Sequence, residues 1–182
     1  MTKRLLLVLV LMTLAACGKD DSTAGLDHSS GAMNTAAPFD AQFIDGMIEH
    51  HTSAIAMAEQ ALKESQRAEI KQLAQTIINS QQTEVSQMTA WRTQWYADVA
   101  ATGGMGMDMG AMTISSDASK SFDQRFLEAM ISHHEGALTM AKEAQTKATR
   151  AEIKTLAGAI ITAQEAEIAQ MKTWLKDWFG VQ

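Results

Sequence analysis

Apolar residues recur every three or four positions along two long stretches of the chain, from Phe43 to Leu62 and from Ile70 to Trp95. This spacing places the apolar side chains on one face of an α-helix, which packs against a core while the opposite face meets solvent. Between the two stretches, residues 63–67 are polar. The pattern therefore predicts two helices that fold back on each other as an antiparallel hairpin.

The hairpin pattern occurs a second time at an offset of 83 residues, so that Phe39 corresponds to Phe122. The offset holds without a gap through Met47/Met130, His50/His133, His51/His134, Met57/Met140, Ile70/Ile153, Met88/Met171, Trp91/Trp174 and Trp95/Trp178. In the second copy, Thr149 followed by Glu152 is typical of a capping box at a helix start. We expect an all-α fold, a four-helix bundle built from two repeated helical hairpins, with a long Gly-rich crossover over residues 99–120. Two separately paired hairpins or a domain-swapped dimer would satisfy the same pattern.

The start of the chain carries a different pattern. Lys3 and Arg4 precede an apolar run over residues 5–14 that is too short to span a bilayer as a mature helix, and small residues then lead to Cys17. This arrangement resembles the lipobox of bacterial lipoproteins, in which the cysteine is lipidated and becomes the mature N-terminus. An ordinary signal peptide with a chance cysteine is the alternative. Residues 18–37 are rich in Gly, Ser, Asp and Ala, as in a flexible tether.

These patterns divide the chain into consecutive segments. They are a lipoprotein signal peptide at 1–17, a tether at 18–37, the first hairpin at 38–98, the crossover at 99–120 and the second hairpin at 121–182. Gly18 directly after the cysteine resembles the pattern for sorting to the outer membrane. We therefore expect a protein anchored by lipid in the bacterial cell envelope, outer membrane favoured, that faces the periplasm.

The net charge and the cysteine content limit which partners and which metal ligands the chain can have. The formal net charge of −6 gives no basic surface that would indicate nucleic acid or an anionic lipid. Cys17 is the single cysteine. If it carries lipid, any site for a soft metal must do without thiolate.

Two adjacent histidines interrupt the apolar face of the first helix in each copy. At about 100° per residue, Met47 and His51 point to the core side of the first helix, whereas His50 and Met57 share its flank. His50 should therefore lie at the edge of the bundle. Counted from the hairpin turn, the facing pairs are His51 with Gln81 and Met47 with Glu84, and in the second copy His134 with Gln164 and Met130 with Glu167.

An ordinary core could explain one copy of this arrangement. A buried histidine is commonly hydrogen-bonded to a group such as Gln81, and methionine commonly fills gaps in a core. The adjacent second histidine needs another partner, however, and both histidines are repeated. Imidazole with thioether is a ligand set for Cu(I). Di-iron bundles instead place glutamate three residues before histidine, where this chain has Met47 and Met130, which disfavours a di-iron oxidase.

We therefore predict a copper site in each copy. The candidate ligands are Met47, His50 and His51, completed by Met88 or Glu84, and Met130, His133 and His134, completed by Met171 or Glu167. At about 1.5 Å of rise per residue, Met57 lies roughly 15 Å from Met47 along the helix. Met57 could therefore pair with His50 only by stretching, or serve a second site with another helix, and the same holds for its counterpart Met140.

The crossover adds four methionines in a Gly-rich segment: Met105, Met107, Met109 and Met112. Thioethers in such a segment bury nothing unless the segment docks. Alternating thioethers can wrap a Cu(I) or Ag(I) ion, and glycine permits the necessary turns. We predict a weaker metal site here, with a low-complexity linker as the alternative.

The paired motifs Met-Ile-x-His-His, Ala-x-x-Met-Ala, Ile-Lys-x-Leu-Ala and Gln-Met resemble the bacterial "domain of unknown function 305" family, twice over, from about Phe39 to Phe179. The resemblance implies a ferritin-like fold, a periplasmic or membrane-tethered location, and copper binding with a role in copper tolerance. It implies metal ligands at Met47, His50, His51, Met57 and Met88, and at Met130, His133, His134, Met140 and Met171.

Taken together, the sequence predicts a lipid-anchored periplasmic protein that sequesters or transfers Cu(I), with Ag(I) as a mimic. We do not expect an enzyme, because the chain shows no nucleophile–base arrangement. The expected partners are the metal ion, the membrane and a copper donor or acceptor protein, and a homodimer stays open. The alternatives are a metal-free helical adaptor of the envelope and, less favoured, a di-iron oxidase.

Overall fold

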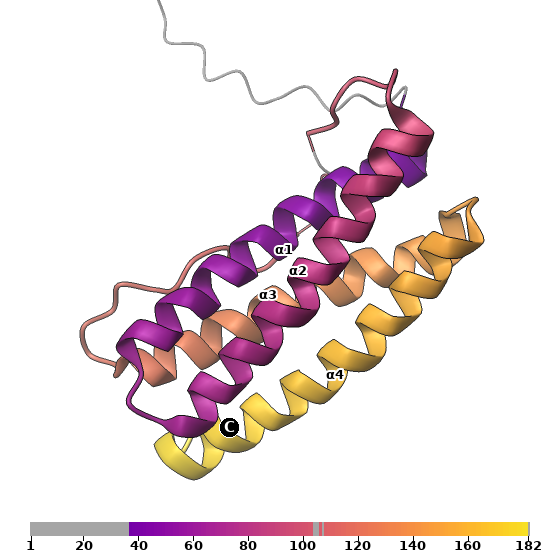
Figure 1. The fold of residues 1–182 in the computed structure, drawn as a ribbon. Helices are drawn as coiled ribbons and strands as arrows, with labels where there is room; N and C mark the ends of the chain where they lie inside the picture. The colour runs from indigo at the N-terminus through magenta and orange to yellow at the C-terminus, as the bar shows by residue number, and fades with distance from the viewer. Residues whose placement is uncertain (1–36, 104–105, 107, 182) are drawn as a thin grey trace, which may run out of the picture. The chain divides into compact units, whose positions relative to one another are not determined.

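The computed structural model describes residues 37–103, 106 and 108–181, within which four helices and no strand occur. Helix α1 is Phe39–Glu64, α2 is Ala68–Tyr96, α3 is Phe122–Lys147 and α4 is Ala151–Phe179 (Figure 1). The predicted all-α fold of two helical hairpins is confirmed. The predicted signal peptide, Cys17 and nearly all of the tether lie outside the described residues. None of the helices in the described part of the chain combines the length and the hydropathy of a membrane-spanning segment.

The two hairpins, α1 with α2 and α3 with α4, meet chiefly along α1 and α3. These two helices run antiparallel, because the Lys147 ammonium at the end of α3 lies 5.9 Å from the centre of the Phe39 ring at the start of α1. Two grooves lie between α2 and α4, one beside Trp174 and the other beside Trp91. Helices α1 and α3 therefore form the centre of the arrangement.

Buried side chains form two core clusters, and each cluster draws on both hairpins. One contains Phe43, Ile44, Met47 and Met88 from the first hairpin with Met140, Ala144, Ile153 and Ile160 from the second. The other contains Met57, Ile70 and Ile77 from the first hairpin with Phe126, Met130 and Met171 from the second. Neither hairpin encloses a complete apolar core by itself, so the two hairpins must fold as one unit.

A buried carboxylate fastens the start of α1 to the turn before α4. Asp40 is only 1% exposed, and it accepts hydrogen bonds from the Thr149 amide at 2.9 Å, the Thr149 hydroxyl at 2.6 Å and the Arg150 amide at 3.1 Å. The Tyr96 hydroxyl donates to the same carboxylate at 3.2 Å. The predicted capping box of Thr149 and Glu152 is therefore wrong, and α4 begins without a side-chain cap. Asp40 takes the donors of Thr149 because a buried carboxylate accepts charge-assisted hydrogen bonds, which are the stronger kind.

Arginine side chains stack on tryptophan rings at both ends of the paired hairpins. The Arg67 guanidinium lies 4.2 Å from the centre of the Trp178 ring, and the Arg150 guanidinium lies 3.9 Å from that of Trp95. The two contacts are equivalent under the repeat. Each one joins the turn of one hairpin to the last turns of the other hairpin by a cation–π contact.

Replacing Asp40 with Asn should lower the free energy of unfolding by about 2–4 kcal/mol, because the buried donors of Thr149 and Arg150 lose their charged acceptor. Urea denaturation followed by circular dichroism measures this loss. Asp123 occupies the same position in the second repeat but is partly exposed and holds Arg67 at 3.4 Å, so Asp123→Asn should cost less than about 1 kcal/mol. Equal losses in the two variants would contradict the clamp.

Candidate metal centre

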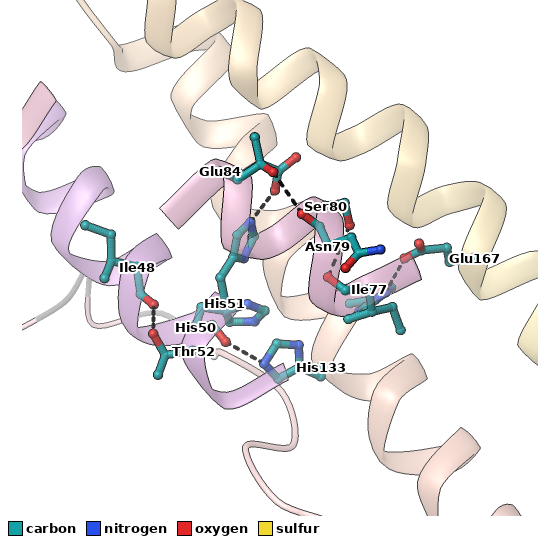
Figure 2. A network of polar contacts seen from close by, with 12 residues as sticks. Ile48, His50, His51, Thr52, Ile77, Asn79, Ser80, Glu84, His133 and Glu167 are labelled. Atoms are coloured by element: carbon teal, nitrogen blue, oxygen red, sulfur yellow. Dashed lines mark hydrogen bonds and ion pairs between the residues drawn. The ribbon is translucent and has the colours of Figure 1, made fainter. Parts of the chain in front are cut away.

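The four predicted histidines meet where α1 crosses α3, and all four are fully buried. The rings of His50 and His133 lie 3.7 Å apart between their centres, tilted by 39° (Figure 2). The prediction that His50 lies at the edge of the bundle is wrong. Its flank of α1 packs directly on α3, and the crossover lies against it as well, so the helix has two buried sides at this point.

His51 and His134 each contact a glutamate of their own hairpin. The Nε2 atom of His51 lies 2.6 Å from a carboxylate oxygen of Glu84 (Figure 2). In the second hairpin, Nε2 of His134 lies 2.7 Å from a carboxylate oxygen of Glu167. The predicted pairing of these histidines with Gln81 and Gln164 is wrong by about one helical turn. Side chains in a helix lean toward its N-terminus, so His51 reaches toward the C-terminal part of the antiparallel α2. The same shift applies to Met47, which shares a core cluster with Met88 rather than facing Glu84.

The Nε2 atom of every ring in this group contacts an oxygen. His50 Nε2 lies 3.1 Å from the carbonyl oxygen of Met109. His133 Nε2 lies 3.0 Å from the carbonyl oxygen of His50 and 2.7 Å from the hydroxyl of Ser53. Carbonyl and carboxylate oxygens only accept hydrogen bonds, so Nε2 must carry the proton in each neutral ring and Nδ1 must carry the lone pair.

Six buried acceptor atoms in this region have no hydrogen-bond partner among the described residues. They are Nδ1 of His50, His51, His133 and His134, and Oε1 of Gln81 and Gln164. An unpaired buried polar atom is costly, and native proteins contain few of them. All six offer a lone pair, so what would satisfy them is a donor or a cation.

The two histidines at the crossing point stay neutral over a wide pH range. Burial, followed by repulsion from neighbouring imidazoles, lowers the pKa of His50 from 6.5 to about 3 and that of His133 to about 2. A neutral imidazole is the form that binds a metal ion. Protonation therefore does not compete with a metal for these two rings near neutral pH.

The buried thioethers form two groups, and each group contains methionines of both repeats. Met47 and Met88 share one cluster with Met140, and Met130 and Met171 share the other with Met57. The sequence left Met57 to pair with His50 by stretching or to serve a second site with another helix, and Met140 likewise. Because α1 and α3 run antiparallel, each of these methionines joins the core cluster that holds the candidate thioethers of the other repeat.

No three His, Cys, Asp or Glu side chains converge as a metal site within residues 37–103, 106 and 108–181. The partly exposed carboxylates of Glu84 and Glu167 each contact the Nε2 atom of one histidine instead. A metal bound by the Nδ1 atoms would therefore complete its coordination with ligands of another kind, and the buried thioethers are the neighbouring candidates.

The crossover reaches the same place, with a backbone group that the sequence did not indicate. Met105 and Met107 lie outside the described residues, whereas Met109 presents its carbonyl to His50 and Met112 places its sulfur 3.5 Å from the Ser53 hydroxyl. Sequence reasoning missed Ser53 and the Met109 carbonyl. Gly136, a glycine in the middle of α3, was the available signal, because such a glycine often marks the close approach of another backbone.

The lowered pKa values predict an acid-sensitive metal-free protein. Between pH 6.5 and about 3 the unfolded chain binds protons at His50 and His133 that the folded chain does not, so the free energy of unfolding falls as pH drops, by up to about 1.4 kcal/mol per pH unit for each ring. Urea denaturation of the apo protein from pH 6.5 to 4.5 should show this slope, and a His50→Gln/His133→Gln variant should show a shallower one. Equal slopes in the wild type and in this variant would contradict the lowered pKa values of His50 and His133. His28→Gln is the control and should keep the wild-type slope.

Comparisons with known proteins identify a matching family and similar solved structures. A family model described as "Domain of unknown function (DUF305)" matches residues 21–92 and 40–175. The structure of CopM in the Cu(I)-bound form is 38% identical, with a TM-score of 0.65, and the match covers 77% of this chain and 97% of CopM. CopM in the Ag-bound form obtained by soaking is 36% identical over the same shares, with a TM-score of 0.66.

Two further similar proteins extend the comparison. A DUF305 fragment from Deinococcus radiodurans is 28% identical, with a TM-score of 0.66, over 78% of this chain and 97% of the fragment. A stretch of 51 residues is 43% identical to an uncharacterized protein, L153, of Acanthamoeba polyphaga mimivirus, and it spans 28% of this chain and 34% of that protein. The family match covers most of the chain, as does that to CopM, and this chain belongs to the DUF305 family.

Proposed function

We propose that this protein binds copper as Cu(I), through imidazole Nδ1 atoms and methionine thioethers, and that Ag(I) acts as a mimic. The observation that carries the proposal is the set of four buried imidazoles whose Nε2 atoms are all held by oxygen while their Nδ1 lone pairs have no partner among the described residues. Histidines that bind metals characteristically donate their other ring N–H to a carboxylate or a carbonyl, which fixes the tautomer and the ring orientation. Glu84 and Glu167 supply such carboxylates here.

The chemistry of the donor set favours a soft monovalent ion. Thioethers bind Cu(I) well and bind hard cations poorly, whereas carboxylate-rich sites suit iron or manganese. Among the described residues, the carboxylates nearest the histidines, those of Glu84 and Glu167, engage Nε2 and not the free Nδ1 atoms. CopM, a relative with the same fold, has been solved in Cu(I)-bound, Cu(II)-bound and Ag-bound forms, which supports the same metals for this chain.

Complete burial of the candidate ligands supports sequestration or transfer of the ion rather than catalysis on a substrate. A catalytic metal keeps an open coordination position that a substrate can reach, and the four histidines here have no exposed surface. A metal-free adaptor would leave the unpaired Nδ1 atoms without a role. Two of the four tryptophans that could serve an adaptor surface, Trp95 and Trp178, already stack on Arg150 and Arg67. We therefore propose that the protein contributes to copper tolerance.

The proposed cellular location rests on the sequence before the folded part. The positive residues, the short apolar run and Cys17 favour a lipid anchor in the envelope, and a periplasmic location suits thioether ligands in place of thiolate. A copper donor or acceptor protein would then meet the folded part on the periplasmic side.

Removing the thioethers without disturbing the core should weaken Cu(I) binding. Met88→Leu/Met171→Leu keeps the core volume and should cost less than about 1.5 kcal/mol of stability. The same variant should weaken Cu(I) by about tenfold or more, as should Glu84→Gln/Glu167→Gln, whose glutamates orient the rings. An anaerobic competition with a chromogenic Cu(I) chelator measures both effects.

Controls and opposite outcomes for this test are available in the chain. Glu135→Gln changes an exposed glutamate of α3 and should leave the affinity unchanged. Combined replacement of the four buried histidines by Gln should abolish most tight binding, with circular dichroism as the check on folding. Wild-type affinity in the folded histidine variant would refute the site. Metal analysis of protein purified from cells should find copper, and iron in its place would favour the di-iron alternative.

Cys17→Ser should release the protein from membranes or stop its processing, because lipidation requires the thiol. Cell fractionation and mass spectrometry of the mature N-terminus measure the two effects. An unlipidated wild-type chain in the soluble periplasmic fraction would refute the anchor. Ser22→Ala in the predicted tether is the control and should stay in the membrane fraction.

A further inference from the structure

The crossover lies against the crossing point of α1 and α3 through residues 108–112. The Asp108 carboxylate accepts a hydrogen bond from the Gly110 amide at 2.9 Å, which forms a local turn. The Ala111 amide donates to the Ser132 hydroxyl of α3 at 3.2 Å. On the α1 side, the Met112 sulfur lies 3.5 Å from the Ser53 hydroxyl. The segment therefore bridges both helices directly over His50.

This contact coincides with a departure from the two-fold relation between the repeats. Under the offset of 83 residues, Ser53 of α1 corresponds to Gly136 of α3. The Ser53 hydroxyl contacts His133 Nε2 at 2.7 Å. At the equivalent place, Gly136 offers no side chain to His50, and the Met109 carbonyl fills that role from 3.1 Å.

Two glycines, Gly136 and Gly110, allow the backbone of residues 108–112 to lie close against α3. A Cβ atom added at Gly136 would lie 2.4 Å from the carbonyl carbon and oxygen of Met109. Gly110 has a φ of +70°, and a Cβ atom there would lie 2.0 Å from the Ser132 carbonyl oxygen. Real Cβ atoms do not approach backbone so closely, so a side chain at either position must displace the segment.

We propose that residues 108–112 form a cover over His50, and that copper enters and leaves the histidine group when this cover undocks. The proposal rests on the proposed function. His133 is covered by the backbone of α1, which can move only if the helix moves, and by the Ser53 side chain of the same helix. The cover over His50 is a loop held by a few hydrogen bonds, and such segments open at a lower free energy than packed helices.

The cover also makes the two repeats unequal in copper exchange. Repeat one opens through a loop, whereas repeat two has helix backbone over its histidine. Met112 travels with the cover, and its sulfur lies 3.5 Å from the Ser53 hydroxyl, which contacts His133 Nε2. Undocking of the cover would therefore present this soft ligand to solvent, in keeping with the weaker metal site predicted for the crossover.

Gly136→Ser tests the cover, because it restores in α3 the residue that α1 carries and leaves no room for the Met109 carbonyl. Amide hydrogen exchange of Gly110 and Ala111 in the apo protein should rise about tenfold or more, and copper release to an excess of chelator should accelerate by a similar factor. Gly158→Ser is the matched control, since a Cβ atom at this helical glycine meets only the flexible Gln145 side chain at 3.3 Å. Both rates should stay at wild-type values in the control.

Gly110→Ala should also accelerate amide exchange and copper release. It changes the crossover and leaves the helices intact, so it can be used if Gly136→Ser fails to fold. Met109→Leu keeps the backbone carbonyl, so its amide exchange should match wild type. Unchanged amide exchange in both glycine variants would overturn the docked cover. Faster amide exchange with unchanged copper release would overturn its role as the gate. Failure of the wild-type protein to bind Cu(I) would instead refute the proposed function on which the gate depends.

Discussion

The structure depends on burying four imidazoles where α1 and α3 cross. A neutral imidazole carries one N–H and one lone pair, and burying either without a partner costs about 1–3 kcal/mol. The N–H of every ring is satisfied from a different direction, by Glu84 on α2, by Glu167 on α4, by the backbone of α1 and by the crossover. The elements around the crossing point are thus tied to it by one requirement. The lone pairs that remain unpaired are the atoms through which we propose that the centre binds copper.

If copper binds as proposed, the division of the thioethers between two core clusters would couple metal binding to the pairing of the hairpins. Met140 comes from the second hairpin but packs with Met47 and Met88 of the first, and Met57 makes the reverse contribution. A ligand that binds only the folded state stabilises that state by mass action. An ion held by thioethers of both hairpins would therefore oppose their separation, and loosening of the hairpins would weaken both sites together.

The sequence was sufficient for the parts of the fold that repeat with a helical period. The four helices, the short turns and the inward direction of His51 follow from spacing alone, because apolar periodicity reports which face of a helix is buried. The position of His50 could not be predicted in this way, because a helix at the centre of a bundle is buried on two sides and the period reveals the more apolar one. The pairing of His51 with Glu84 depends on the lean of helical side chains, which counting residues from a turn ignores.

Contacts between the repeats were the least predictable, because no local pattern specifies which residue of one copy meets which residue of the other. Asp40 was visible only as part of a repeated motif, although it holds the turn before α4 with hydrogen bonds from Thr149 and Arg150. The exchange of Ser53 for Gly136 was visible in the sequence as a departure from the repeat. The reason for this exchange became clear only from the path of the crossover, which places the Met109 carbonyl against His50.

The mixed composition of the two core clusters also bears on the origin of the chain. A protein with a single hairpin of this kind would hold half of each cluster, and it would have to associate with a second copy to bury its apolar face. Two identical copies would carry the same residue at the position of Ser53 and Gly136, and neither would have a connecting segment to dock there. Joining the copies into one chain creates a single linker, and with it the opportunity to make one half of a symmetric pair behave differently from the other.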